Sequence, residues 1–156
     1  MESHVHGFDA DLHHANAWLA SVAKRIPPGE ADAAKRVLRS VLHALRDFLG
    51  PTRATALAAQ LPTVIRGVYF EGFRAGKRTP TVRTKSEFLS RIAKELGVES
   101  SIEAQTAADA VLHTLWNHID PGEVASIKAH LPGIATLWPT RPDAIDVAAR
   151  RLHSRA

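Results

Sequence analysis

Apolar side chains recur every three or four positions between residues 30 and 49. The recurring positions are Ala34, Val37, Leu38, Val41, Leu42, Leu45, Phe48 and Leu49. This spacing puts them on one face of an α-helix and predicts an amphipathic helix that ends at Gly50. Because such a face is stable only when it is covered, we expect other helices to pack against it.

Proline and glycine residues divide the rest of the first half into further helices. A first helix is predicted from about residue 11 to residue 25, where Pro27, Pro28 and Gly29 break the chain. Pro51 suits a first helical position, so it opens a third helix. Pro62 separates this helix from a fourth helix that reaches about residue 70.

The second half of the chain carries clearer signals for the start of helices. Thr84 and Glu87 have the spacing of a capping box, in which each side chain binds a free backbone N–H of the first turn. Asp120 followed by Pro121 predicts another helix start. Residues 140–143 resemble the cap of a final helix that would end near His153.

The second half also repeats the first at a constant offset of 70 residues, without an insertion from about residue 16 to residue 68. Val41-Leu42-His43-Ala44-Leu45 recurs as Val111-Leu112-His113-Thr114-Leu115, and Leu61-Pro62 recurs as Leu131-Pro132. Because the matches fall mainly on apolar and turn positions, they indicate a duplication.

The expected fold is therefore all-α. We expect two tandem copies of a roughly four-helix unit, packed as one helical bundle with approximate two-fold symmetry, followed by a C-terminal helix. The expected organisation is a first repeat over 9–70, a basic linker over 71–83, a second repeat over 84–139 and a C-terminal helix or tail over 140–156.

Composition excludes several chemistries and locations. The chain has no cysteine, so disulfides, thiolate metal sites and cysteine nucleophiles are excluded. Its N-terminus lacks the apolar run of a signal peptide, and no stretch approaches the roughly 18 apolar residues of a membrane span. We therefore expect a cytoplasmic protein that has no membrane partner. Phosphate-binding and dinucleotide-binding glycine patterns are absent, so no cofactor is expected.

Histidine is the obvious candidate for site chemistry, since the chain has nine. Four of them, His4, His6, His13 and His14, cluster near the N-terminus and could bind a divalent metal, although a solvated chain end is the simpler interpretation. His43 and His113 are equivalent in the two copies, and each lies almost opposite its own apolar face. They should be exposed or face the other copy. Neither has the Glu-x-x-His spacing of a metal-binding bundle, so we expect no enzyme.

Positive charge is concentrated around the linker. Between residues 66 and 85 there are six cationic residues and one acidic residue, an excess larger than the net charge of +4 on the whole chain. The candidate polyanion-binding residues are Arg36, Arg39, Arg46, Arg66, Arg74, Lys77, Arg78, Arg83 and Lys85. The candidate interaction surface consists of His43, Tyr69, Phe73, His113 and Trp116. The cations could track a phosphate backbone beside stacking aromatics. A solubilising linker whose aromatics fold onto the core is the favoured interpretation, because Arg and Lys are ordinary surface residues.

Several short motifs resemble those of a known family. They are Val41-Leu42-His43-Ala44-Leu45, Ala58-Ala59-Gln60-Leu61-Pro62, Tyr69-Phe70-Glu71-Gly72-Phe73, Glu87-Phe88-Leu89 and Ala129-His130-Leu131-Pro132. Over about residues 12–138 the chain resembles the prokaryotic family catalogued as domain of unknown function 2267. Phe73 departs from that family's pattern, in which tryptophan is common, and the tail from Thr140 looks like an addition. The resemblance implies a small bacterial helical protein, loosely associated with stress, and it transfers no catalytic residue.

Three classes of function remain open. The first and favoured class is a non-enzymatic helical interaction module, which binds a protein partner or a second copy. The second is a sequence-independent binder of nucleic acid or another polyanion through the basic linker. The third is a metal-binding protein that uses its histidines.

Overall fold

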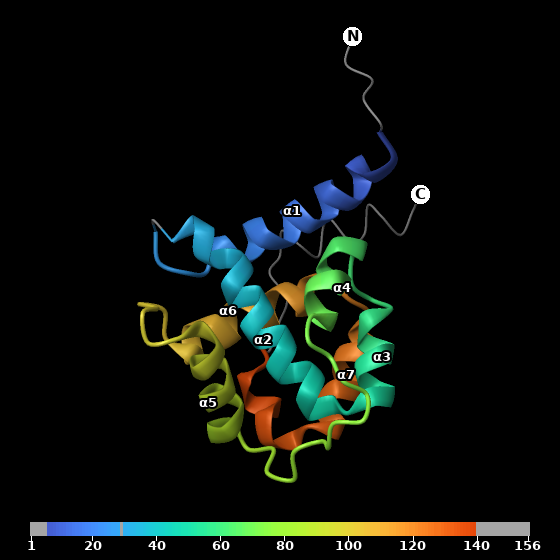
Figure 1. Cartoon of the computed structure of the whole chain (residues 1–156), viewed down its shortest axis with the longest axis vertical. Helices are drawn as coiled ribbons and strands as arrows, with labels where there is room; N and C mark the ends of the chain where they lie inside the picture. Colours follow the sequence, from blue (N-terminus) through green and yellow to red (C-terminus); the bar gives the residue numbers. More distant parts are fainter. Residues whose placement is uncertain (1–5, 29, 140–156) are drawn as a thin grey trace.

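The computed structural model describes residues 6–28 and 30–139, and in these ranges every regular element is helical (Figure 1). The α-helices are α1 (Asp9–Ala23), α2 (Ala34–Leu49), α3 (Pro51–Ala58), α4 (Thr63–Phe70), α5 (Lys85–Leu96), α6 (Ala104–His118) and α7 (Pro121–His130). Short 3-10 helices are η1 (His6–Phe8), η2 (Ala31–Ala33) and η3 (Pro132–Leu137). The all-α prediction is confirmed. The predicted final helix ending near His153 lies outside the described residues.

Local chemistry explains where several helices begin and end. The Thr84 side chain accepts a hydrogen bond from the Glu87 N–H at 3.2 Å, which is the threonine half of the predicted capping box. The Glu87 carboxylate instead lies 3.3 Å from Arg91 Nε, one turn further along α5. Asp120 Oδ1 accepts from the Gly122 N–H at 2.6 Å and caps α7. Gly50 ends α2 with a φ of +79°, a left-handed conformation that favours glycine.

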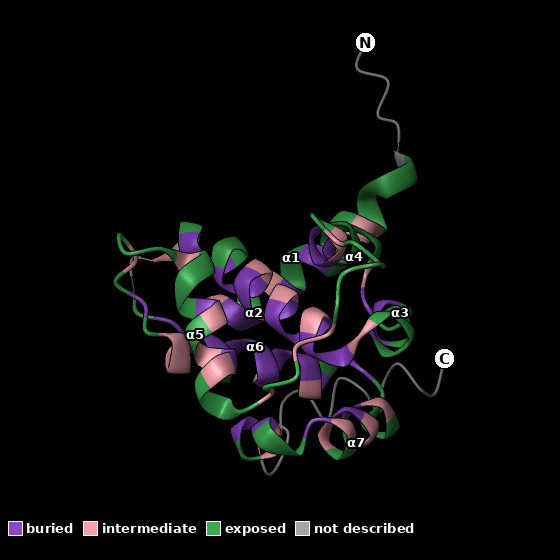
Figure 2. Ribbon diagram, turned by 60° about the horizontal axis from the view of Figure 1, so that its bottom comes forward, coloured by how far each residue is buried: buried purple, intermediate pink, exposed green. Residues whose placement is uncertain are grey.

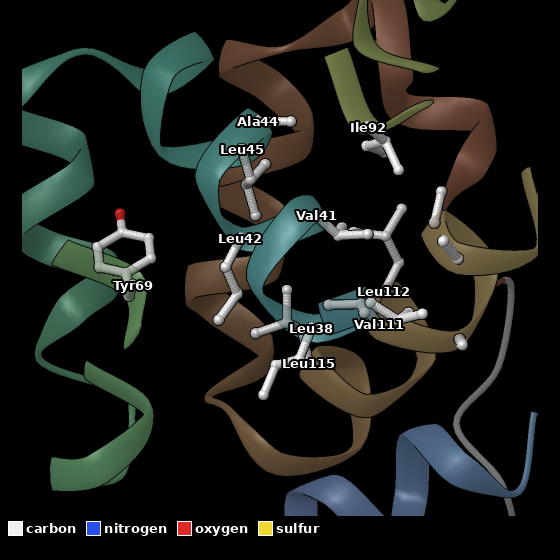
Figure 3. Packing of buried hydrophobic residues seen from close by; sticks show 14 of the residues in the cluster. Leu38, Val41, Leu42, Ala44, Leu45, Tyr69, Ile92, Val111, Leu112 and Leu115 are labelled. Carbon is white, nitrogen blue, oxygen red and sulfur yellow. The ribbon is translucent and has the colours of Figure 1, made fainter. Parts of the chain in front are cut away.

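The core lies between α2 and α6, which run side by side through the middle of the molecule (Figure 2). Figure 3 shows the apolar side chains of α2 facing those of α6. Leu38, Val41, Leu42 and Leu45 of α2 and Val111, Leu112 and Leu115 of α6 are all fully buried. The apolar face predicted for residues 34–49 is therefore the centre of the molecule.

Two helices of the second half begin 70 residues after two helices of the first half. The first residues of α2 and α3, Ala34 and Pro51, correspond to Ala104 and Pro121, the first residues of α6 and α7. In each half, the first helix packs against the second helix of its own half and against the second helix of the other half. Thus α1 contacts both α2 and α6, while α5 contacts both α6 and α2. Residues 9–70 and 84–139 consequently share one core.

Among the described residues, no helix combines the length and the apolar character needed to cross a bilayer.

Candidate functional site at the basic loop and the groove between α2 and α5

The segment that joins α4 to α5 begins against a buried arginine. We call residues 71–83 the basic loop. Arg46 is 6% exposed, and its Nη1 donates hydrogen bonds to the carbonyl oxygens of Tyr69 and Glu71, both at 2.8 Å. Its Nε donates to Asp47 Oδ1 at 2.9 Å, and the guanidinium lies 5.6 Å from the centre of the Phe73 ring. Arg46, a candidate for polyanion binding, is therefore engaged within the fold, because the loop folds back over this face of α2 and buries most of its side chain.

The aromatic residues beside the loop pack on one another. Tyr69 is fully buried, and its hydroxyl donates to the Ala54 carbonyl oxygen at 2.7 Å. Burial raises the pKa of Tyr69, which keeps the hydroxyl protonated as a donor. Phe70 contacts both the Tyr69 ring and the Phe73 ring, with centroids 5.0 Å and 5.4 Å apart. The prediction that Tyr69 belongs to an interaction surface is therefore wrong, while Phe73 remains half-buried.

The basic loop is also held at its far end. A Cβ atom on Gly50 would lie 3.0 Å from Thr79 Oγ1, so the loop rests directly on the turn between α2 and α3. Arg83 Nη1 donates to the Phe48 carbonyl oxygen at 3.3 Å. Between these anchors, the exposed residues Arg74, Lys77 and Arg78 project from a turn in which the Lys77 N–H donates to the Arg74 carbonyl. The loop therefore presents three cations from a backbone fixed at both ends.

The remaining predicted cations differ in their surroundings. Arg66 donates to the Ala58 and Leu61 carbonyl oxygens at 2.9 Å and 3.1 Å, at the end of α3. Arg39 forms an ion pair with Glu71 at 2.9 Å. Arg36 and Lys85 are exposed. The nine predicted cations thus form no single stripe, because Arg46, Arg66 and Arg83 bind backbone carbonyls.

An open groove of about 650 Å³ lies beside the loop, between α2 and α5. We call it the α2–α5 groove, and its lining residues are His43, Ala44, Asp47, Lys77, Glu87, Ser90, Arg91, Lys94 and Glu95. Three of these are basic and three are acidic. Sequence reasoning missed the contribution of α5, although Glu87, Arg91 and Glu95 follow one another at the four-residue spacing that places side chains on one helical face.

His43 is one of the residues that line the α2–α5 groove. Its Nδ1 lies 2.6 Å from Glu95 Oε1, and its Nε2 lies 2.8 Å from the Val68 carbonyl oxygen. Both partners are oxygen acceptors, so each ring nitrogen of His43 is engaged within the fold. The side chain is 12% exposed and faces α5, the first helix of the other half. Of the two placements predicted for His43, the structure has the one that faces the other half.

The equivalent histidine has the opposite electrostatic setting. Burial lowers the pKa of His113, the positive charge of Arg25 lowers it further, and Asp109 opposes the shift. Arg25 stands at the position equivalent to Glu95. The two halves therefore place a carboxylate beside one histidine and a guanidinium beside the other.

This setting predicts a pH dependence of stability that depends on His113. The pKa of His113 in the folded protein lies below the value of 6.5 that it has in an unfolded chain, so the unfolded state binds the proton more readily. The contribution of neutral His113 to stability is fully present above pH 6.5, and it is lost as the pH falls through the pKa that His113 has in the folded protein. We expect His113→Gln to flatten the fall of the urea midpoint between about pH 7 and pH 5. His14→Gln, which alters an exposed residue of α1, should keep the parent slope, and an equal flattening in both variants would contradict the assignment.

Trp116 and His113, both predicted for the interaction surface, belong to neither the groove nor the loop. Trp116 is half-buried on α6, 6.4 Å from the Trp138 ring, with Lys128 Nζ 5.5 Å from its own ring centre. The structure thus separates the five predicted surface residues. His43 lines the groove and Phe73 packs at the start of the loop, while Tyr69 is core and the other two residues lie on α6.

The N-terminal histidines, which could bind a divalent metal, lie partly within the described residues. His13 and His14 are exposed neighbours on α1, with ring centroids 6.3 Å apart, and His4 lies outside the described residues. In the part of the chain that the structure describes, no group of three His, Asp or Glu side chains is arranged to hold a metal ion.

A family model matches most of the chain. It is the model of an uncharacterized conserved protein, DUF2267, and it covers residues 15–137. The chain therefore belongs to the DUF2267 family, as the sequence motifs indicated. No curated protein matches the chain.

Proposed function

We propose that this chain is a non-enzymatic interaction module that binds a protein partner, or a second copy of itself, through the α2–α5 groove. The observation that carries the proposal is the charge of the groove. Lys77, Arg91 and Lys94 stand among Asp47, Glu87 and Glu95 in one open hollow. Charges of both signs complement a protein surface that also carries both, and such complementarity sets the specificity and rate of association.

The side chains that could act as catalysts are already hydrogen-bonded within the fold, which favours binding over catalysis. His43 contacts an acceptor through each ring nitrogen, so neither nitrogen is left to activate Ser90 or a bound water. The Tyr69 hydroxyl and the Arg46 guanidinium are bound to backbone carbonyls. These groups hold helices together, and an open groove suits a macromolecular surface better than an enclosed small substrate.

Duplication of a four-helix unit is part of the same proposal. It is supported by α2 and α3, which begin 70 residues before α6 and α7, and by the overlap of α1 with α5 and of α4 with η3 when the first half is shifted by 70 residues. It is also supported by the crossed packing of α1 on α6 and α5 on α2. We further propose that the module acts in the bacterial cytoplasm in a stress response, as its resemblance to the DUF2267 family implies.

Charge reversal in the groove tests the proposed contact. We expect the double change Arg91→Glu and Lys94→Glu to weaken partner binding or self-association by about tenfold, which corresponds to the loss of about 1.4 kcal/mol of charge-pair energy. Light scattering measures self-association, and quantitative mass spectrometry of cross-linked complexes from the source organism measures partner binding. Lys35→Glu, an exposed change on α2 outside the groove, is the matched control. A strict monomer whose captured proteins are identical for all three chains would overturn the proposal.

A sequence-independent polyanion binder is the second candidate, favoured by the exposed Arg74, Lys77 and Arg78 on the fixed loop. The three groove carboxylates oppose a uniformly negative polymer, so this candidate ranks second. Retention on heparin that collapses with salt and is abolished by changing these three residues to Ser would favour it over the first.

A further inference from the structure

We propose that a second, smaller hollow under the basic loop binds one compact dianion of the phosphate or phosphate-monoester type. We call it the cationic hollow. Its charged lining consists of Arg46, Arg74, Lys77, Arg78 and Arg91 with a single carboxylate, Asp47. This site goes beyond the proposed protein contact, because it requires no macromolecular partner.

The concentration of charge is the first argument. Five cationic side chains surround one carboxylate, and that carboxylate already accepts a hydrogen bond from Arg46. Like charges held together in a concave, partly desolvated space repel one another and focus a positive potential. An anion with two negative charges relieves that repulsion more than a single chloride does, and its several oxygens offer acceptors to more than one donor.

The fixed backbone of the loop is the second argument. Arg46 holds the carbonyls at the start of the loop, and Thr79 rests against Gly50 near its end. Arg74 and Lys77 are therefore carried on a turn that is already positioned. Preorganised donors bind an anion without the entropic cost of ordering a free chain.

The other half of the molecule supplies an internal comparison. At the offset of 70 residues, Arg46, Asp47 and Arg91 correspond to Trp116, Asn117 and Ser21. Where α1 packs on α6, Thr114 Oγ1 donates a hydrogen bond of 3.0 Å to Ser21 Oγ, and both side chains are buried. The positions equivalent to Arg46, Asp47 and Arg91 are thus uncharged where α1 packs on α6, so the packing of two such helices does not by itself require charged residues at these positions.

The volume of the cationic hollow and its opening into the α2–α5 groove limit the kind of ligand that fits. Its space of about 20 Å³ admits one water-sized group. It shares Asp47, Lys77 and Arg91 with the α2–α5 groove. One oxygen-bearing end of a tetrahedral anion fits at this depth, while anything attached to it would extend into the groove. The source is accordingly either free phosphate or a small molecule that carries a phosphate monoester.

Titration of the full chain with inorganic phosphate and with O-phosphoserine, at constant ionic strength, tests the site and separates the two sources. We expect saturable binding of phosphate, followed by calorimetry or by NMR shifts of loop amides, that Lys77→Gln weakens about tenfold. Arg74→Gln should act in the same direction, and both residues are exposed, so neither change should unfold the chain. Lys85→Gln removes an exposed charge outside the hollow and should leave the affinity unchanged.

The outcomes are distinct. Equal affinity for the two probes supports a site for the dianion alone, and tighter binding of O-phosphoserine supports a ligand whose body lies in the groove. Absence of saturable binding overturns the proposal, as does an equal loss in Lys77→Gln and Lys85→Gln, which would indicate diffuse screening. Because the probes are small anions, failure here leaves the protein contact at the groove to be judged by its own charge-reversal experiment.

Discussion

Leu112→Ala should lower the free energy of unfolding by about 2–5 kcal/mol. Leu112 is fully buried on α6, in the layer where the apolar faces of α2 and α6 meet (Figure 3). Removing three carbon atoms there forfeits their transfer from water and leaves a cavity, since both helices are held from several sides and cannot collapse into it. Urea denaturation followed by circular dichroism measures the loss.

The equivalent change in the first half extends this prediction. Leu42 is also fully buried and occupies the matching position on α2, so Leu42→Ala should cost a similar amount. Because α1 and α5 each contact both central helices, either variant should unfold in one transition with an unchanged dependence on urea. Val98→Ala, at a position that is 102% exposed, should change stability by less than about 0.5 kcal/mol. Two separate transitions in either leucine variant would contradict a shared core.

The helices could be predicted from the sequence because their signals are local. The spacing of apolar residues in α2, the prolines at the starts of α3 and α7, and the cap at Thr84 each act within a few residues. The sequence predicts that α2 begins at about residue 30, but the first turn over Ala31–Ala33 is a 3-10 helix. Short 3-10 turns are common at the beginning of helices and leave little trace in composition.

The site could not be predicted in the same way, because it depends on contacts between distant segments. A helical wheel places Arg46 on the polar side of α2, and nothing local indicates that the chain after Tyr69 returns to cover it. The same return buries Tyr69 itself and fixes the basic loop. By contrast, the four-residue spacing of Glu87, Arg91 and Glu95 is a local signal and predicts one charged face of α5 from the sequence alone.

Residues that lie 70 positions apart on the central and first helices of the two halves differ in their chemistry. His43 Nδ1 lies 2.6 Å from Glu95 Oε1, whereas burial and the positive charge of Arg25 lower the pKa of His113. Glu87 and Arg91 line the open groove, whereas Ala17 and Ser21 stand at the equivalent positions on α1. Packing alone is satisfied by the small side chains of α1. The packing of α5 on α2 therefore does not explain why Glu87 and Arg91 are charged.

Arg46→Met should destabilise the chain by about 2–4 kcal/mol, although the substitution is apolar and similar in length. The cost arises because the Tyr69 and Glu71 carbonyls lose a charged donor and Asp47 loses its hydrogen-bonded partner. Arg46→Lys is the informative second variant. It keeps the positive charge, but one ammonium nitrogen cannot reproduce the fork that reaches both carbonyls and Asp47, so we expect most of the loss to remain.

If Arg46 holds the basic loop in place, replacing it should release the loop, whereas a residue that only adds surface charge would leave the loop fixed. Trypsin cleaves after Arg74, Lys77 and Arg78, and cleavage requires the loop to open locally. Both Arg46 variants should be cut faster within residues 74–78 than the parent chain, under conditions in which the core remains folded. Arg36→Lys and Arg36→Met, at an exposed position of the same helix, should keep the parent stability within about 0.5 kcal/mol and the parent rate of cleavage. If Arg46→Lys behaved like the parent in both measurements, charge alone would be sufficient at this position, and the loop would owe its conformation to Phe73, Thr79 and Arg83 instead.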